Sequence, residues 1–252
     1  MLALNLWKTY GVRRGSRRIS DCAKHRQAKG TSPHRIDTFH SCAYTSRPLT
    51  ITAFREPPEG RVATLQGRCP LPHVPIVPPE QASKDVQEVY EEFYRRMSFP
   101  APPNFIMTQG HSATVARGTW EAVKNVLVSG AIPRWQKEMM FVAISKDRAC
   151  RYCTAAHIAC CRMLGVKPEM LESLVRDIDH IPDPKLRDMI KFSLKCSRNP
   201  QGLTDRDYAT LRERGLSQPE ILEIIAMSAL AVYANILADA TAMESDGMFN
   251  TL

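Results

Sequence analysis

From about residue 79 onward, apolar residues recur every three or four positions, which is the spacing of one face of an α-helix. The stretch "PPEQASKDVQEVYEEFYRRM" shows this pattern, with acidic residues on the side opposite the apolar face. The apolar face carries Val86, Val89, Tyr90 and Phe93. Ser83 precedes this face and is the predicted N-cap, because a serine hydroxyl can accept a hydrogen bond from a free N–H group of the first turn. An amphipathic helix that packs on one side is therefore expected here.

Similar periodicity predicts helices over residues 111–129, 133–145, 148–164, 167–175, 184–196, 204–214 and 218–243. Pro133 and the sequences "TDRD" and "SQPE" mark expected starts, and Gly130, Gly165 and Gly215 stand where helices are expected to stop. "SFPAPPNF" is predicted to be a linker, because proline lacks the N–H group that a helix needs. No run of alternating β-branched residues indicates a sheet, so the predicted fold class is all-α.

The distribution of charge divides the chain into two parts. Residues 1–70 hold thirteen Lys and Arg against four Asp and Glu, a balance of +9, whereas residues 71–252 hold twenty-one against twenty-two, a balance of −1. The first part has scattered apolar residues with neither helical nor strand periodicity, so we expect it to be mostly disordered. A compact helical domain is expected to begin at Leu71 and to extend to Leu252.

Three origins stay open for the basic segment. Its richness in Arg and Ser, with few acids, is typical of an organelle transit peptide. It could also be an arm that binds nucleic acid or anionic lipid, or translation could start downstream of it. No secretory signal is evident, since the apolar run of residues 1–7 is short and follows no basic region. We expect a cytoplasmic protein, or an organellar one if the segment is a genuine transit peptide.

Residues 221–240 form the most apolar stretch of the later chain, but Glu223, Asn235 and Asp239 interrupt it. This composition predicts a buried helix of a soluble protein and argues against a membrane span. The adjacent apolar helices carry more apolar surface than one small domain needs, which favours a homo-oligomer.

Four of the eight cysteines lie within twelve residues, a concentration more typical of a catalytic or metal-binding cluster than of a secreted disulfide scaffold. If this stretch is one helix, Cys150, Cys153 and His157 fall on one stripe, at spacings of three and four residues. The free N–H groups and the positive dipole end of the first turn favour a thiolate there. Arg148 and Arg151 are expected to act in the same direction.

A cysteine pair at this spacing can close a disulfide, and an imidazole one turn away can relay the proton of a thiol. Glu138 supplies a proton acceptor if the turn "SKDRA" folds its helix back against His157. The offsets of 12, 3 and 4 that link Glu138 to Cys150, Cys153 and His157 recur from Glu220, where they fall on Val232, Asn235 and Asp239. The recurrence suggests a duplicated helical unit whose second copy has lost the thiols.

The pattern Glu-x11-Cys-x2-Cys-x3-His, read here as Glu138, Cys150, Cys153 and His157, resembles the core motif of the alkylhydroperoxidase D family within the carboxymuconolactone decarboxylase superfamily. The downstream "EIIAMSALAVYANILADA" looks like the closing helix of the peroxidase-related branch of that family. The resemblance covers the chain from about Pro72 to its end and does not extend to the first seventy residues. Four matched positions in a helical context are more specific than a CxxC alone.

The resemblance implies a helical, oligomeric thiol peroxidase without a bound cofactor. By analogy with the family, Cys153 would attack the hydroperoxide, after activation by Glu138 acting through His157 and a water molecule. The resulting sulfenic acid would be resolved by Cys150 to a disulfide. An external dithiol, which in the family can be a lipoyl-protein, would then reduce the pair. Neither a membrane nor a nucleic acid is an expected partner.

Tyr152 departs from the family pattern. Alkylhydroperoxidase D has a second histidine between its thiols, whereas the sestrins resemble this chain in a Cys-x-Tyr-x4-His spacing and in a related helical fold. A phenol is a poorer base than imidazole at neutral pH, so the substitution bears on the peroxidase rate and not on the fold. Tyr152 is therefore an auxiliary site candidate that could also simply cover the site.

The remaining cysteines are given structural roles. Cys160 and Cys161 continue the stripe of His157 and are predicted to be small apolar core residues, while Cys22, Cys42 and Cys69 show no partner pattern. A zinc site, with a nucleic-acid-binding function, is the alternative for the set Cys150, Cys153, His157 and Cys160. However, four ligands along one helix cannot surround a tetrahedral ion. We therefore expect no metal at this cluster.

A further alternative keeps the fold but removes the activity, as in a decarboxylase-like or regulatory relative. In the family that this chain resembles, decarboxylating members do not rely on a CxxC sequence. The presence of CxxC here therefore favours the peroxidase interpretation over the decarboxylase one.

Overall fold

The structure is a computed structural model that describes residues 71–250, with the side chain of residue 250 excepted. The predictions made for residues 1–70, including a disordered basic segment and the cysteines Cys22, Cys42 and Cys69, lie outside the described residues.

Helices make up the regular structure of residues 71–250, which include no strand, so the predicted all-α class is confirmed. The α-helices are α1 (Lys84–Met97), α2 (Asn104–Thr108), α3 (Ala113–Ala122), α4 (Arg134–Asp147), α5 (Arg151–Met163), α6 (Pro168–Arg176), α7 (Pro184–Arg198), α8 (Asp205–Glu213) and α9 (Gln218–Ala240). Between them lie a π-helix, η3 (Val123–Val128), and the 3₁₀ helices η1 (Pro79–Gln81), η2 (Gln109–His111), η4 (Ile178–His180), η5 (Pro200–Gly202) and η6 (Gly247–Asn250).

The first amphipathic helix forms as its pattern predicts, because α1 buries the four apolar residues of the predicted face together with Met97. Ser83 occupies its N-cap position, but its side chain makes no capping hydrogen bond. The linker prediction is wrong at its end, because Asn104 and Phe105 already belong to α2. Pro103 stands directly before this helix, at a place where a missing N–H group removes no intrahelical hydrogen bond.

The single helix predicted over residues 111–129 is also wrong, because α3 changes into the π-helix η3. The end of η3 is held by Lys137, whose side chain is fully buried. Its Nζ atom donates to the carbonyl oxygens of Val126, at 2.9 Å, and Ser129, and it pairs with Glu223 Oε2 at 2.9 Å. The periodicity of residues 111–129 cannot predict these contacts, because Lys137 and Glu223 belong to other helices, α4 and α9.

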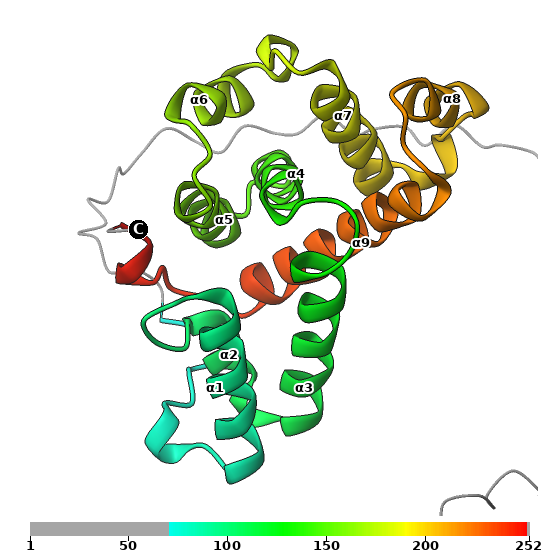
Figure 1. Cartoon of the computed structure of the whole chain (residues 1–252). Coiled ribbons are helices and arrows are strands. Elements are labelled where there is room, and N and C mark those ends of the chain that lie inside the picture. Colours follow the sequence, from blue (N-terminus) through cyan, green and yellow to red (C-terminus); the bar gives the residue numbers. More distant parts are fainter. Residues whose placement is uncertain (1–70, 251–252) are drawn as a thin grey trace, which may run out of the picture. The chain divides into compact units, whose positions relative to one another are not determined.

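α4 and α5 form an antiparallel hairpin in the middle of the helical domain. Figure 1 shows them side by side, with α9 passing across one side and α6 and α7 on the other. Residues 137–145 of α4 are all buried, which is the expected pattern for a helix with neighbours on every side. The hairpin turn ends at Ala149, whose φ of 57° lies in the left-handed region. This turn brings the second helix back along the first.

α9 is the long apolar helix that the sequence predicts. By length and composition it could cross a membrane, and half of its most apolar stretch is buried inside the described part of the chain. The other side leaves Leu222, Tyr233 and Ile236 exposed. Burial of that side in a homo-oligomer stays a prediction.

The recurring offsets do not correspond to equal geometry. Glu138 and Cys153 lie on two helices joined by a turn, whereas Glu220 and Asn235 lie on the single helix α9. Fifteen residues of one helix separate the latter pair by about 22 Å along its axis. Glu220 serves instead in a capping box with Ser217 at the start of α9. These positions therefore do not mark a duplicated pair of helices.

Candidate functional site

The two thiols of the CxxC sequence lie at the start of α5. The predicted helix start at residue 148 is wrong: Cys150 is the N-cap and Cys153 is the third residue of α5, because the left-handed Ala149 interrupts the helical backbone. Both cysteines are buried and free. Their side chains therefore occupy the N-cap and N3 positions, where the free N–H groups of a helix gather.

The surroundings of the two thiols separate their acidities. The hydrogen bond from Cys150 lowers the pKa of Cys153, and Asn235 of α9 contributes in the same direction against the effect of burial. Cys150 shows the opposite shift, because its hydrogen bond with Cys153 and its burial raise its pKa well above the usual range. Cys153 is thus the favoured thiolate, and Cys150 the favoured neutral thiol.

The expected contribution of the two neighbouring arginines is not found. Arg148 and Arg151 are exposed, and neither is among the causes of the lowered pKa of Cys153. Their charges lie in water, where screening weakens their effect on a buried thiol.

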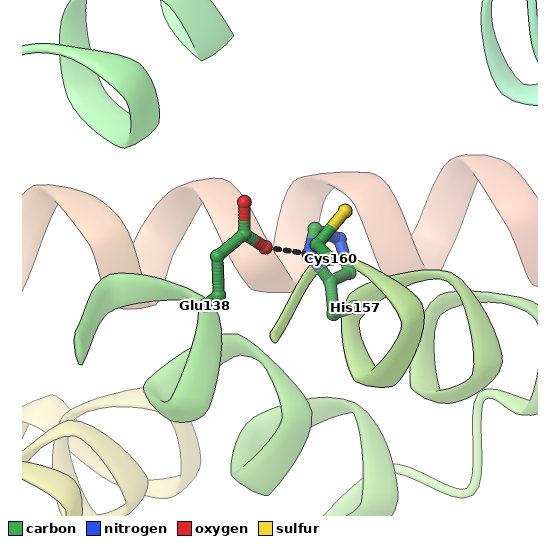
Figure 2. Close-up of side chains that lie close together, drawn as sticks. All are labelled: Glu138, His157 and Cys160. Carbon is green, nitrogen blue, oxygen red and sulfur yellow. Dashed lines mark hydrogen bonds and ion pairs between the residues drawn. The ribbon is translucent and has the colours of Figure 1, made fainter. Parts of the chain in front are cut away.

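Glu138 and His157 are in direct contact across the hairpin. His157 Nδ1 lies 2.5 Å from Glu138 Oε2 (Figure 2). On the other side of the carboxylate, Arg134 Nε donates to Glu138 Oε1 at 3.0 Å. The Glu138 side chain is fully buried, whereas the side chain of His157 is 12% exposed. The ring of Phe141 stacks on that of His157, with centroids 3.5 Å apart, and so fixes the plane of the imidazole. The carboxylate thus orients the histidine from one side and is itself neutralised from the other.

Burial acts to raise the pKa of the Glu138 carboxyl, but the charges and hydrogen bonds of His157 and Arg134 outweigh it, so the pKa is lowered from its usual value. Glu138 is therefore an anion at neutral pH. A buried carboxylate held in this way stabilises a neighbouring imidazolium, which is the property a proton relay requires.

Cys160 was predicted to be a small apolar core residue, but it also lies next to Glu138 and His157. It is buried, as predicted, and Figure 2 shows its sulfur beside Glu138 and His157. The potential ligand atoms of these three residues lie within 4.8 Å of one another. Burial raises the pKa of the Cys160 thiol well above its usual value, and the charge of Glu138 adds to the effect. Cys161 is buried as predicted.

The residues that could bind a metal ion in the structure are therefore not the four zinc ligands considered from the sequence. Among residues 71–249, the only cluster of three or more potential ligands is Glu138, His157 and Cys160, without Cys150 or Cys153. Both oxygens of Glu138 are already engaged, one by His157 and the other by Arg134. The guanidinium charge beside the carboxylate opposes a divalent cation, so these residues fit a hydrogen-bonded relay better than a metal centre.

A cavity of about 50 Å³ adjoins the reactive side chains. Cys153, His157 and Cys160 supply its polarisable and polar groups. The rest of the wall is apolar and largely aromatic, and consists of Phe93, Met97, Phe99, Pro103, Phe105, Val123, Leu127, Phe141, Tyr152, Ala156, Ala234 and Phe249. Since Cys153 and His157 are also one helical turn apart, a small molecule in the cavity can meet both.

Tyr152 contributes its ring to the cavity, but its hydroxyl is committed elsewhere. The hydroxyl donates to Asp246 Oδ2 at 2.6 Å and accepts a hydrogen bond from Phe105 N at 3.0 Å. Asp246 also accepts from Asn104 N, at 3.0 and 3.1 Å to its two oxygens. Tyr152 thus connects Asp246, near the end of the described residues, to the start of α2.

Tyr152→Phe is expected to destabilise the fold by about 2 kcal/mol, because it leaves the buried Asp246 without its hydroxyl donor. We expect the alkylation rate of Cys153 to stay within about twofold of the wild type. Urea unfolding and thiol labelling measure the two effects. Tyr208→Phe is the matched control, because the hydroxyl of Tyr208 makes no hydrogen bond with the described residues. A large loss of Cys153 reactivity in Tyr152→Phe would instead give the phenol a chemical role.

Several residues of this site do not stand out in the sequence. Arg134 could have been found, since it stands four residues before Glu138 on the same helix. Asn235 marks a polar interruption of an apolar helix, but its neighbours are not readable from that pattern. Asp246 and Phe249 follow the last long helix and reach the site only through tertiary packing. No local signal predicts their positions.

The fold and the site define a class: an all-α domain in which a CxxC sequence opens one helix of a central hairpin and a Glu–His pair bridges its two helices. Solved structures with the same architecture show that this is the alkylhydroperoxidase D fold. A peroxidase-related protein with an AhpD core from Ralstonia eutropha JMP134 is 24% identical, with a TM-score of 0.65 over 71% of this chain and 95% of that one. A peroxidase-related protein from Silicibacter sp. TM1040 is 22% identical, with a TM-score of 0.65 over 73% and 97% of the two chains.

The fold is not confined to peroxidase-related proteins. The debrominase Bmp8, in a complex of one of its variants with 2,3,4-tribromopyrrole, is 18% identical to this chain, with a TM-score of 0.62 over 71% of this chain and 94% of that one. Neither the protein-family models nor the curated protein sequences include a match to this chain.

Proposed function

We propose that this protein is a thiol-dependent peroxidase that reduces hydroperoxides through the Cys150–Cys153 pair, with Glu138 and His157 as its proton relay. One observation carries the proposal. The thiol whose pKa is lowered, Cys153, stands one helical turn before the imidazole that contacts a buried carboxylate, and both side chains line one cavity. A nucleophile, a relay and a partly enclosed cavity are thereby brought together.

The first step is the attack of the Cys153 thiolate on the terminal oxygen of a hydroperoxide. An S–O bond forms, the O–O bond breaks, and the leaving alkoxide takes a proton from the imidazolium of His157. That proton came from the Cys153 thiol when the thiolate formed. Glu138 stabilises the imidazolium between the two transfers, because its carboxylate lies 2.5 Å from Nδ1. The products are an alcohol and a sulfenic acid on Cys153.

In the second step Cys150 attacks the sulfur of the sulfenic acid. The S–S bond forms, the S–O bond breaks, and the hydroxide leaves as water with the proton of Cys150. A neutral thiol suits this position, because its proton is needed by the leaving group. An external dithiol, such as a dihydrolipoyl group on a protein, then reduces the disulfide and completes the two-electron cycle.

The cavity favours an organic hydroperoxide as the substrate over hydrogen peroxide. Its wall is apolar apart from the reactive groups, so an alkyl or aryl part of a hydroperoxide would gain from leaving water there. The cavity of about 50 Å³ is partly open, so it needs to enclose only a part of such a group.

One equivalent of cumene hydroperoxide is expected to remove two thiols per chain from the fully reduced protein. Each turnover converts two thiols to one disulfide, so their losses must coincide. Titration with a chromogenic disulfide before and after the peroxide, followed by peptide mass analysis, measures the loss and locates the bond. Restoration of both thiols by dihydrolipoamide completes the test. Loss of a single thiol, or a bond that omits Cys150 or Cys153, would contradict the two-cysteine cycle.

A further inference from the structure

Asn235 is a buried polar residue of α9 to which the cycle above gives no task. Its side chain is fully buried. Its Nδ2 atom donates to Ser145 Oγ at 3.0 Å, whereas its Oδ1 atom has no hydrogen-bond partner among the described residues. A buried carbonyl oxygen without a donor destabilises a fold, so such an atom calls for an explanation.

The place of Asn235 is fixed by its contacts with the CxxC segment. Ser145 receives the amide of Asn235 on its hydroxyl and the backbone N–H of Cys150 on its carbonyl, at 2.9 Å. Ser145 is itself fully buried in α4, so it ties α9 to the turn that carries the thiols. Ala234, the residue before Asn235, lines the same cavity as Cys153. Ser145 thus holds one of the two N–H bonds of the amide at the segment that carries the thiols, and the Asn235 side chain is also a hydrogen-bonding neighbour of Cys153.

We propose that Asn235 is a catalytic residue for the sulfur chemistry of Cys153: its second N–H bond donates to the thiolate, and its Oδ1 accepts the hydroxyl proton of the Cys153 sulfenic acid. The inference rests on the proposed peroxidase function for its second half only. The terminal oxygen of the hydroperoxide keeps its hydrogen when the S–O bond forms, so the product carries one O–H donor where the reactant sulfur had none. The amide of Asn235 therefore provides an N–H donor for the thiolate and an oxygen acceptor for the sulfenic acid.

The effect of Asn235 on Cys153 agrees with this arrangement, because the amide acts to lower the pKa of that thiol. Other groups also act on Cys153. The hydrogen bond from Cys150 lowers its pKa, whereas the charge of Asp239, which is exposed on α9, raises it. Tyr152, the neighbouring residue of α5, is itself affected by Cys153, because the charge of the thiolate helps to raise the pKa of the Tyr152 hydroxyl. A change at Asn235 alone leaves these three groups in place.

The test is the pH dependence of alkylation of Cys153 by iodoacetamide, followed by peptide mass analysis in the full chain. Asn235→Asp keeps the shape but replaces the N–H donor by an acceptor with a negative charge, and Asn235→Leu removes both polar groups. Both variants are expected to move the midpoint to higher pH, with a loss of about tenfold or more in rate at pH 7. Ser228→Ala is the matched control, because Ser228 is also buried on α9 but its side-chain hydrogen bonds go to Ile224 O of its own helix and to Cys196 of α7, and not to Cys153.

Another variant tests the inference if the Asn235 variants do not fold. If the changes at Asn235 unfold the chain, Ser145→Ala leaves Asn235 intact but releases its amide, and a smaller shift in the same direction is expected. In folded protein, an alkylation midpoint that is unchanged in every variant overturns the inference.

The two proposals can fail separately. If the wild type consumes no hydroperoxide but the variants still shift the alkylation midpoint, the contact of Asn235 with the thiolate stands and the peroxidase proposal fails. If the wild type is an active peroxidase, the Cys153 sulfenic acid in a Cys150→Ser background is expected to react with dimedone several times faster after Asn235→Leu. An unchanged trapping rate overturns the role of Oδ1.

Discussion

Cys153→Ser is expected to abolish hydroperoxide consumption, with a loss of about 10³-fold or more in kcat/KM. A serine hydroxyl at the same place is not ionised near neutral pH, so neither the lowered pKa nor the relay can make it a comparable nucleophile. Steady-state consumption of cumene hydroperoxide in the presence of a dithiol measures the effect.

Cys150→Ser is expected to fail differently. The Cys153 sulfenic acid still forms but is not resolved within the chain, so one equivalent of peroxide is consumed per chain and dimedone labels Cys153. This first turnover is expected to be slower than in the wild type, because the hydrogen bond from Cys150 is the largest cause of the lowered pKa of Cys153. Cys196→Ser, a change of a buried thiol on α7, is the control that should leave turnover intact. Many turnovers in Cys150→Ser would show that resolution does not need Cys150.

Glu138→Gln is expected to lose about 3–5 kcal/mol of unfolding free energy and about 10²- to 10⁴-fold in peroxidase rate. The stability loss arises because Arg134, whose side chain is only 16% exposed, would keep its charge without the anion that neutralises it. The rate loss arises because an amide cannot stabilise the imidazolium of His157 as a carboxylate does. Urea unfolding and hydroperoxide kinetics at pH 7 measure the two quantities.

A matched control exists on α1. Glu91 and Arg95 have the same spacing of four residues as the buried pair, but both side chains are more than half exposed, so Glu91→Gln should change stability by less than about 1 kcal/mol. The double variant Arg134→Gln with Glu138→Gln should recover stability but not rate. Full activity in Glu138→Gln would exclude a relay through this carboxylate.

The pH dependence of stability follows from the same residue. The pKa of Glu138 is lower in the folded state than its usual value of 4.5, so its stabilising contribution is present above that value and is lost as the pH falls through the folded pKa. The acid limb of the stability curve should therefore be shallower in Glu138→Gln than in the wild type.

The sequence predicts the features that depend on local spacing. Helical periodicity was sufficient for the all-α class, and the offsets among Glu138, Cys153 and His157 indicated one site on two neighbouring helices. The contact between Glu138 and His157 needs only the hairpin turn to form as its sequence suggests. The roles of these residues in catalysis, the reductant, the oligomeric state and the cellular location stay predictions.

Features that depend on distant packing were not predictable in the same way. Asp246 meets Tyr152 across 94 residues, and Asn235 meets Ser145 across 90. The end of the π-helix η3 is bound by a lysine of the next helix, and the helix start at Arg151 follows one left-handed residue. In each case the deciding interaction lies outside the window over which a hydrophobic period can be read.

The stacking of His157 on Phe141 makes the relay observable by NMR spectroscopy. Protons held over the face of an aromatic ring resonate upfield, and the two rings are inclined by only 17°. The ring protons of His157 should therefore separate from those of His73, His111 and His180, for which no aromatic stacking is found in the described structure. Their chemical shifts also follow the protonation of the imidazole. A single resolved signal could thus report the state of the proton relay in the resting protein, without substrate or reductant.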